Sequence, residues 1–275
     1  MFSLLKDGIT QSLLQDYMMC PTRYRLSTEL WAGPESEAMR TGSMAHDIID
    51  KVRKGADVNS VLKSIPIPKS GEIAKHMIAV TILSATIPGY LKRYPVSKEK
   101  IIETEHLFDV KLGGFRLRGK IDSIRKSNTI GEMKFRGRIS EDLEVRLALD
   151  WQSLFYLSAM YLETKKFHLK VFYDVIRVSG MKDCDLKSLY DKIQADIAVR
   201  PEYYYYRYES EFTESDILAF IDELKAKLTE LWERKRWWKN QCACNAPYPC
   251  AFQGMCASGD TSGLIRKKQM FEELK

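Results

Sequence analysis

The fold of this chain is constrained most by a change of periodicity near its middle, where three β-rich segments follow one another. These segments are rich in β-branched and aromatic residues and cover 101–110, 115–125 and 129–135. Gly113-Gly114 separates the first two and Ser127-Asn128 the next two, and such connections are typical of β-hairpins. We therefore expect three antiparallel strands that pair in sequence order.

Segments with helical periodicity surround these three strands. Over 37–52 the residues Ala45, Ile48, Ile49 and Val52 follow one another at helical spacing, which predicts an amphipathic helix. The order helix, three strands, helix, strand predicts an α/β (α+β) fold. The other expected elements are helices over 71–93, 144–163, 186–197 and 214–235, the last capped by Thr213, a strand over 167–178, and a strand or irregular segment over 202–211.

Composition excludes several classes of protein. The chain has 275 residues, of which 45% are hydrophobic, which suits a globular core and rules out disordered and fibrous proteins. Its longest apolar run, 77–90, is interrupted by Pro88 and is shorter than the roughly 20 residues that span a bilayer. The first ten residues include Asp7 and no apolar stretch of a signal peptide. We expect a cytoplasmic protein without a membrane partner.

Charge alone leaves the partner open. Lys and Arg number 43 against 37 Asp and Glu, which gives a net charge of +6 and a pI near 8.8. This excess suits a nucleic acid, but many enzymes of small substrates carry as much.

Two acidic residues and a lysine on neighbouring strands are the strongest candidates for catalysis. Asp122 lies near the end of the second expected strand, and Glu132 and Lys134 lie on the third. Because side chains alternate along a strand, Glu132 and Lys134 share a face, and strand pairing can bring Asp122 beside them. Carboxylates bind Mg²⁺ or Mn²⁺, and an ammonium can orient or deprotonate water. Taken alone, these residues also fit a solvated strand with a cross-strand ion pair.

The placement of Asp122, Glu132 and Lys134 on these elements resembles the PD-(D/E)XK nuclease superfamily. Within it, the chain looks like the RecB-type exonuclease branch, which includes the AddB C-terminal nuclease domain and CRISPR-associated adaptation exonucleases. Ile121 stands where the superfamily usually has proline. The resemblance implies a restriction-endonuclease-like core with a mixed central sheet flanked by helices. It implies one nuclease domain over 1–275, with an N-terminal segment 1–36, a catalytic core 37–180, a helical extension 181–240 and a Cys-rich segment 241–275 that closes onto the N-terminus.

Three further segments carry the same resemblance. Gly42 to His46 resembles an upstream helix motif whose histidine is an extra metal ligand, Gln152 and Tyr156 match a Q-x-x-x-Y helix motif, and Ser12 to Tyr24 resembles an N-terminal motif. Ordinary packing roles also fit these residues, and the sequence leaves open whether Glu105 joins the site. The resemblance implies a catalytic set of Asp122, Glu132, Lys134, Gln152 and Tyr156, and a metal site of His46, Asp122 and Glu132.

Cysteines near the C-terminus predict a second site. Cys242, Cys244, Cys250 and Cys256 lie within fifteen residues, and in a reducing compartment such a cluster favours a metal over disulfides. The spacing lacks the paired C-x-x-C of structural zinc, and thiolate ligation with one distant cysteine suits an iron–sulfur cluster. The resemblance implies a [4Fe-4S] cluster held by Cys20, Cys244, Cys250 and Cys256. Cys242 remains an alternative to Cys244, and zinc an alternative to the cluster.

Two segments interleave cations with aromatic rings, as single-strand binding requires. They are 200–208 and 234–239. The tyrosines of the first equally fit an alternating, half-buried strand, and the tryptophans of the second equally fit packing over the cysteine site. Arg136 and Arg138 follow Lys134 and are predicted to contact phosphates, with Arg207 as a further DNA contact.

Together, the residues and the resemblance predict a metal-dependent exonuclease that acts on single-stranded DNA or DNA ends. Recombination, repair, phage replication and CRISPR adaptation are the processes that the resemblance implies. The chain has no G-x-x-x-x-G-K-[ST] motif, so any unwinding requires a partner such as a helicase. The oligomeric state is left open. The alternatives are a non-catalytic DNA-binding or assembly subunit and a zinc-stabilised interaction module.

Overall fold

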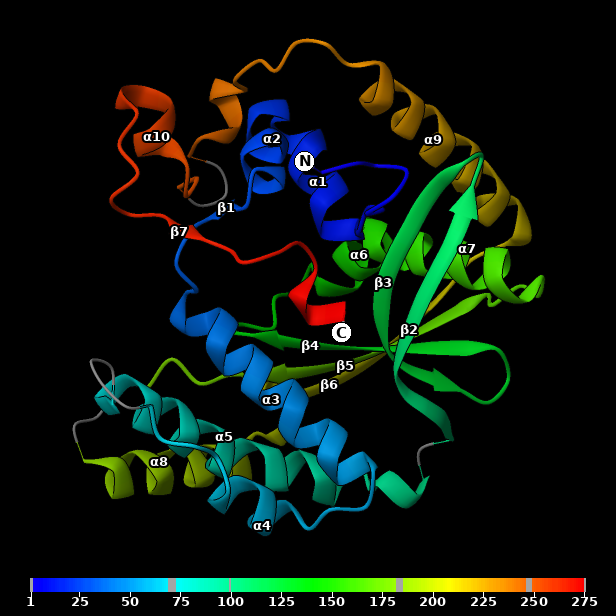
Figure 1. Ribbon diagram of the computed structural model, residues 1–275. Helices are drawn as coiled ribbons and strands as arrows, with labels where there is room; N and C mark the ends of the chain where they lie inside the picture. The colour runs from blue at the N-terminus through cyan, green and yellow to red at the C-terminus, as the bar shows by residue number, and fades with distance from the viewer. Residues whose placement is uncertain (1, 69–72, 99, 182–184, 246–248, 275) are drawn as a thin grey trace.

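A five-stranded sheet forms the centre of the computed structural model, which describes residues 2–68, 73–98, 100–181, 185–245 and 249–274 (Figure 1). Its strand order is β2-β3-β4-β5-β6, and helices cover both faces, which confirms the mixed α+β architecture. The strands are β2 (Ile101–Leu112), β3 (Phe115–Arg125), β4 (Thr129–Arg136), β5 (Lys170–Arg177) and β6 (Tyr205–Glu211). A separate two-stranded sheet pairs β1 (Trp31–Ala32) with β7 (Ile265–Arg266).

The three consecutive antiparallel strands are present as predicted. β2 pairs with β3 and β3 with β4, both antiparallel, whereas β5 lies parallel to β4. Gly113 and Gly114 have positive φ angles of 54° and 92° in the first turn, a backbone region that glycine enters without steric cost. Ser127 and Asn128 have φ angles of 64° and 52°, as a type I′ hairpin turn requires.

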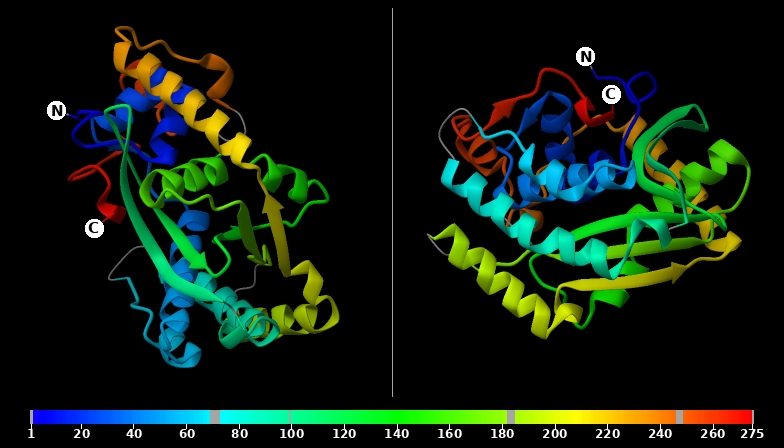
Figure 2. Two further views of the ribbon diagram at one scale, coloured as in Figure 1. Left: turned by 90° about the vertical axis from the view of Figure 1, so that its right-hand side faces the viewer. Right: turned by 90° about the horizontal axis from the view of Figure 1, so that it is seen from below.

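Two hydrophobic clusters pack against opposite faces of the sheet (Figure 2). Ile130 on β4 belongs to the cluster that includes α1, α2, α6, α7 and α9, and Met133 belongs to the cluster that includes α3, α4, α5 and α8. Strand alternation therefore turns Glu132 and Lys134 toward the side of α7. The helices are α1 (Gln11–Met19), α2 (Pro21–Thr28), α3 (Glu37–Arg53), α4 (Val58–Lys63), α5 (Ile73–Arg93), α6 (Leu143–Ala148), α7 (Trp151–Thr164), α8 (Leu186–Val199), α9 (Glu214–Glu233) and α10 (Gln253–Ser258).

One expected helix is divided in two. The segment 144–163 was expected to be continuous, but α6 ends at Ala148 and α7 begins at Trp151. Asp150 lies between them in an extended conformation and caps α7, since its carboxylate accepts a hydrogen bond from the Gln152 backbone N–H. The local cap therefore overrides the apolar periodicity. The predicted cap of α9 is confirmed, because Thr213 forms a capping box with Asp216.

The two ends of the chain lie together above one edge of the sheet (Figure 1). Trp31 pairs with Arg266 in the small sheet, and Ile9 forms a parallel bridge to Leu117 of β3. Phe271 is buried and packs edge-on against Phe2. The C-terminal segment thus closes onto the N-terminal one as expected. In the part of the chain that the structure describes, no helix is both long and apolar enough to cross a bilayer.

Candidate active site

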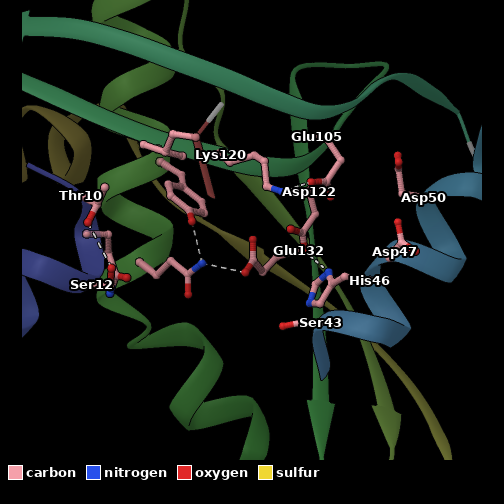
Figure 3. Close-up of a pocket in the computed structure, with 15 residues that line it drawn as sticks. Thr10, Ser12, Ser43, His46, Asp47, Asp50, Glu105, Lys120, Asp122 and Glu132 are labelled. Atoms are coloured by element: carbon pink, nitrogen blue, oxygen red, sulfur yellow. Dashed lines mark hydrogen bonds and ion pairs between the residues drawn. The ribbon is translucent and has the colours of Figure 1, made fainter. Parts of the chain in front are cut away.

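A polar cavity of about 520 Å³ lies between α3, β2, β3, β4 and α7 (Figure 3). His46 enters it from α3, Glu105 from β2, Asp122 from β3 and Glu132 from β4. The close-up shows the side chains of His46, Asp122 and Glu132 directed toward one another across the cavity. Four elements that are distant in sequence therefore place one imidazole and three carboxylates in one cavity.

Asp122 is held in place by the neighbouring strand. Its Oδ2 accepts a hydrogen bond of 2.7 Å from the Met133 backbone N–H, and it lies 3.6 Å from His46 Nδ1. The Asp122 side chain retains only 14% of its exposure, so its carboxylate has little freedom to move. These contacts fix its orientation toward the cavity.

Glu105 completes a set of ligand atoms that could hold a metal ion. One ligand atom each from His46, Glu105 and Asp122 lie within 4.8 Å of one another. Glu105 has a φ angle of +55°, which is uncommon for residues other than glycine, and its carboxylate forms an ion pair with Lys120. The sequence left its membership open, because strand spacing does not reveal a left-handed backbone at this position.

Glu132 has one carboxylate oxygen that is bound and one that is not. Its Oε1 accepts hydrogen bonds from Gln152 Nε2 at 2.7 Å and from Lys134 Nζ at 3.2 Å. Its Oε2 is buried and has no hydrogen-bond partner, although the residue is only 8% exposed. A buried, unpaired carboxylate oxygen is costly, and a cation is the partner that would satisfy it.

Lys134 lies behind Glu132 and does not line the cavity itself. Its ammonium contacts Glu132, Gln152 Oε1 at 2.8 Å and Asp150 Oδ2 at 3.2 Å. Gln152 also donates a 3.0 Å hydrogen bond to the Tyr156 hydroxyl, so it connects lysine, glutamate and tyrosine. Asp150 was missed in the sequence analysis. The pattern Asp-Trp-Gln at a helix start could have indicated it as an N-cap.

Burial and neighbouring charges shift the pKa values of the ionisable groups in this cavity. Desolvation raises the pKa of both Asp122 and Glu132, and the repulsion between neighbouring carboxylates adds to the effect. Desolvation lowers the pKa of His46, which keeps its imidazole neutral and able to bind a metal ion. For Lys134, burial opposes the charge, but Glu132 and Asp150 outweigh it and raise the pKa. Oxygen and neutral nitrogen donors of this kind fit Mg²⁺ or Mn²⁺.

The arginines predicted to contact DNA lie outside the catalytic cavity. Arg136 is the last residue of β4 and Arg138 follows it; both are exposed, and Arg136 lines a separate cavity between α3 and α5. Arg207 is half-buried in β6, where its guanidinium lies 2.5 Å from Asp174 and 3.8 Å from the Tyr94 ring centroid. These contacts give Arg207 a structural role within the sheet, so we do not assign it to DNA.

The cysteines surround a second cavity, of about 460 Å³, between the end of α1, the segment after α9, and α10. Cys20, Cys244, Cys250 and Cys256 line it, whereas Cys242 is exposed and does not. Among the described residues, no three of these thiols have sulfur atoms that all lie within 4.8 Å of one another. Four sulfurs around a single Zn²⁺ would be about 3.8 Å apart, given zinc–sulfur bonds of about 2.3 Å. The four thiols are therefore spread more widely than one zinc ion requires.

The aromatic segments divide between core and surface. Tyr204 and Tyr205 are both buried, and Tyr206 and Tyr208 are half-buried, so these tyrosines lie largely in the core but do not follow the strict alternation that the strand interpretation predicts. Trp237 stacks on Tyr24 with ring centroids 5.6 Å apart, whereas Trp238 stays 54% exposed.

Comparison with known families identifies the superfamily of the chain. A family model described as the PD-(D/E)XK nuclease superfamily matches residues 9–257. The chain belongs to this superfamily. The matched range of this nuclease contains Asp122, Glu132 and Lys134, and it spans both the cavity that Asp122 lines and the cysteine cavity.

Of two solved structures that align with this nuclease, the one with the higher TM-score supports the same fold. A protein from Eubacterium rectale, whose description assigns it provisionally as an exonuclease, aligns with a TM-score of 0.54 and 15% identity, over 90% of this chain and 92% of the other. An alkaline exonuclease from Laribacter hongkongensis aligns with a TM-score of 0.33 and 15% identity, over 83% of this chain and 89% of the other. No curated protein sequence matches this chain.

Proposed function

We propose that this nuclease is a metal-dependent DNA exonuclease that acts on single-stranded DNA or DNA ends. The observation that carries the proposal is the group of His46, Glu105 and Asp122 ligand atoms beside the unpaired oxygen of Glu132. A phosphodiester is hard to hydrolyse because negative charge develops on its oxygens, and a cation held by carboxylates is the usual means of stabilising that charge.

His46, Glu105, Asp122 and Glu132 would hold one Mg²⁺ or Mn²⁺. When bound, the ion supplies Lewis-acid activation of the phosphodiester. The Met133 N–H and the Gln152 amide hold the two central carboxylates in fixed orientations, so little reorganisation is needed on binding. Gln152 and Tyr156 form the wall opposite α3 and position Glu132 rather than take part in bond breaking.

Lys134 acts as a cation and not as a base. Glu132 and Asp150 raise its pKa, so the side chain is protonated at neutral pH. We assign it the task of compensating the buried charge of Glu132, because its three N–H donors already point at Glu132, Gln152 and Asp150. Of the two roles that the sequence allowed, deprotonation of water is disfavoured by its raised pKa, and orientation of water requires one of these three partners to be released.

The cysteine cavity is proposed to hold a [4Fe-4S] cluster through Cys20, Cys244, Cys250 and Cys256. The observation behind this proposal is that these four thiols line one cavity, and a single zinc ion is the alternative occupant. Because Cys20 follows α1 and the other three lie beyond α9, the cluster would connect the two ends of the chain. Such a link restricts a long loop in the unfolded chain and stabilises the folded one.

Cleavage of linear and circular DNA tests the proposal. Linear single strands labelled at either end should be shortened stepwise in Mg²⁺ or Mn²⁺, and the label that is released first identifies the polarity. Circular single strands should stay intact, and Asp122→Asn should cleave neither. Cleavage of circles would contradict the exonuclease proposal. Binding without cleavage by the wild type would favour a non-catalytic DNA-binding subunit.

The cellular setting remains a prediction from the resemblance. We propose cytoplasmic action in recombination, repair, phage replication or adaptation, with a helicase or similar partner to supply single strands.

A further inference from the structure

A groove of about 1080 Å³ lies next to the catalytic cavity and has the opposite charge. It is bounded by the N-terminal residues, α2, the end of α9 and the C-terminal segment. Four arginines and two carboxylates line it, whereas five carboxylates and one lysine line the catalytic cavity. A polyanion is repelled by the catalytic cavity before a cation binds, so most of its attraction to the protein must come from outside that cavity.

Two segments contribute residues both to the groove and to the catalytic cavity. On β3, Arg118 lines the groove and Lys120, two residues further on, lines the cavity. In the C-terminal segment, Phe271 lines the groove and Leu274 lines the cavity. In Figure 1 the C-terminal segment passes between the N-terminal helices and the sheet edge that carries the site. A chain with its end in the cavity can therefore continue into the groove.

We propose that this groove binds the unpaired strand of DNA that extends from the catalytic cavity, an inference that rests on the proposed nuclease function. Arg25 and Arg266 are exposed, although Arg25 also lies 3.5 Å from Glu29 and the Arg266 guanidinium lies 4.8 Å from the Trp31 ring centroid. Trp232 on α9 lines the groove and is 53% exposed. An exposed ring beside cations suits unpaired bases, because bases within a duplex are already stacked on their neighbours.

Binding of short and long oligonucleotides tests the groove. Fluorescence anisotropy would compare fluorescein-labelled dT6, dT20 and a 20-base-pair duplex, with Ca²⁺ replacing Mg²⁺ to prevent cleavage. For the Arg25→Ala/Arg266→Ala variant, we expect the Kd of dT20 to rise at least tenfold. The slope of log K against log salt concentration should become shallower by about 1.4, because each phosphate contact on a single strand contributes about 0.7. Trp232→Ala should raise the Kd of dT20 about tenfold and leave the Kd of the duplex unchanged.

Controls separate the groove from the catalytic site. The Kd of dT6, which is too short to occupy both the cavity and the whole groove, should change less than that of dT20 in every groove variant. Arg146→Ala removes an arginine that is 72% exposed on α6, outside the groove, and should bind dT20 like the wild type. If the groove variants bind dT20 with wild-type affinity and salt dependence while the wild type cleaves DNA, the groove proposal is wrong and the nuclease proposal is unaffected. A wild type that neither binds nor cleaves DNA overturns both.

Discussion

Replacing Glu132 by glutamine should stabilise the metal-free protein at alkaline pH while it abolishes cleavage. The side chain is 8% exposed and, at alkaline pH, ionised beside Asp122. The buried charge lowers the free energy of unfolding, and glutamine lacks this charge. The amide oxygen of glutamine can accept the same hydrogen bonds from Gln152 and Lys134 that Oε1 accepts. Packing and hydrogen bonding are therefore retained, and the charge is the main change.

The magnitude follows from the pKa of this group. Burial and the Asp122 carboxylate raise the pKa of Glu132 from 4.5 to about 7. Since one pKa unit corresponds to about 1.4 kcal/mol, the ionised group costs the fold on the order of 3 kcal/mol at pH 8. At pH 5 the folded group is protonated and the unfolded group is partly ionised, so the cost falls to about 1 kcal/mol. The cost thus grows as the pH rises from 4.5 to 7.

Urea unfolding in chelated buffer at pH 5 and pH 8 measures this difference. The free energy of unfolding of Glu132→Gln should exceed that of the wild type by about 2 kcal/mol more at pH 8 than at pH 5. Glu223→Gln, which replaces a glutamate with 56% side-chain exposure on α9, serves as the matched control and should show no such dependence. A Glu132→Gln variant that is equally destabilised at both pH values would refute the reasoning.

Three further predictions concern other parts of the molecule. Burial opposes protonation of His106, but Glu163 and Glu103 raise its pKa above 6.5. His106→Gln should therefore remove a contribution to stability that is present below pH 6.5 and is lost as the pH rises. An unchanged pH dependence of urea unfolding in this variant would contradict the prediction. Cys20→Ala should abolish absorbance near 400 nm and Cys242→Ala should not, and the reverse pattern would exclude the proposed ligand set. Gly131→Ala should destabilise the fold by about 1–3 kcal/mol, because its Cβ would overlap Ser123 Oγ; a melting temperature equal to the wild type would show that the site relaxes.

The sequence was informative where local chemistry decides the structure. Hairpin turns depend on residues such as Gly113 and Asn128 that tolerate positive φ, and alternation on β4 placed Glu132 and Lys134 on one face. The resemblance to the superfamily rested on Asp122, Glu132 and Lys134, which lie on two consecutive strands. Such features need no knowledge of the rest of the molecule.

Features that depend on tertiary packing were harder to predict. Asp150 reaches Lys134 only because α6 and α7 separate, and apolar periodicity through 144–163 concealed that break. Glu105 enters the metal-ligand group through an unusual backbone angle. Arg207 looked like a DNA contact in sequence, but Asp174 lies 1% exposed beneath it and binds its guanidinium. In each case the partner lies far away in the chain.

The most direct test of the active site compares cleavage and binding by the wild type and Lys134→Ala. Both proteins would be incubated with end-labelled single-stranded DNA in Mn²⁺, and binding would be measured in parallel with Ca²⁺. We predict that Lys134→Ala loses at least a hundredfold in cleavage rate and less than tenfold in affinity, because its ammonium lies behind Glu132 and outside the cavity wall. Cleavage at the wild-type rate by Lys134→Ala would contradict the assignment of this site.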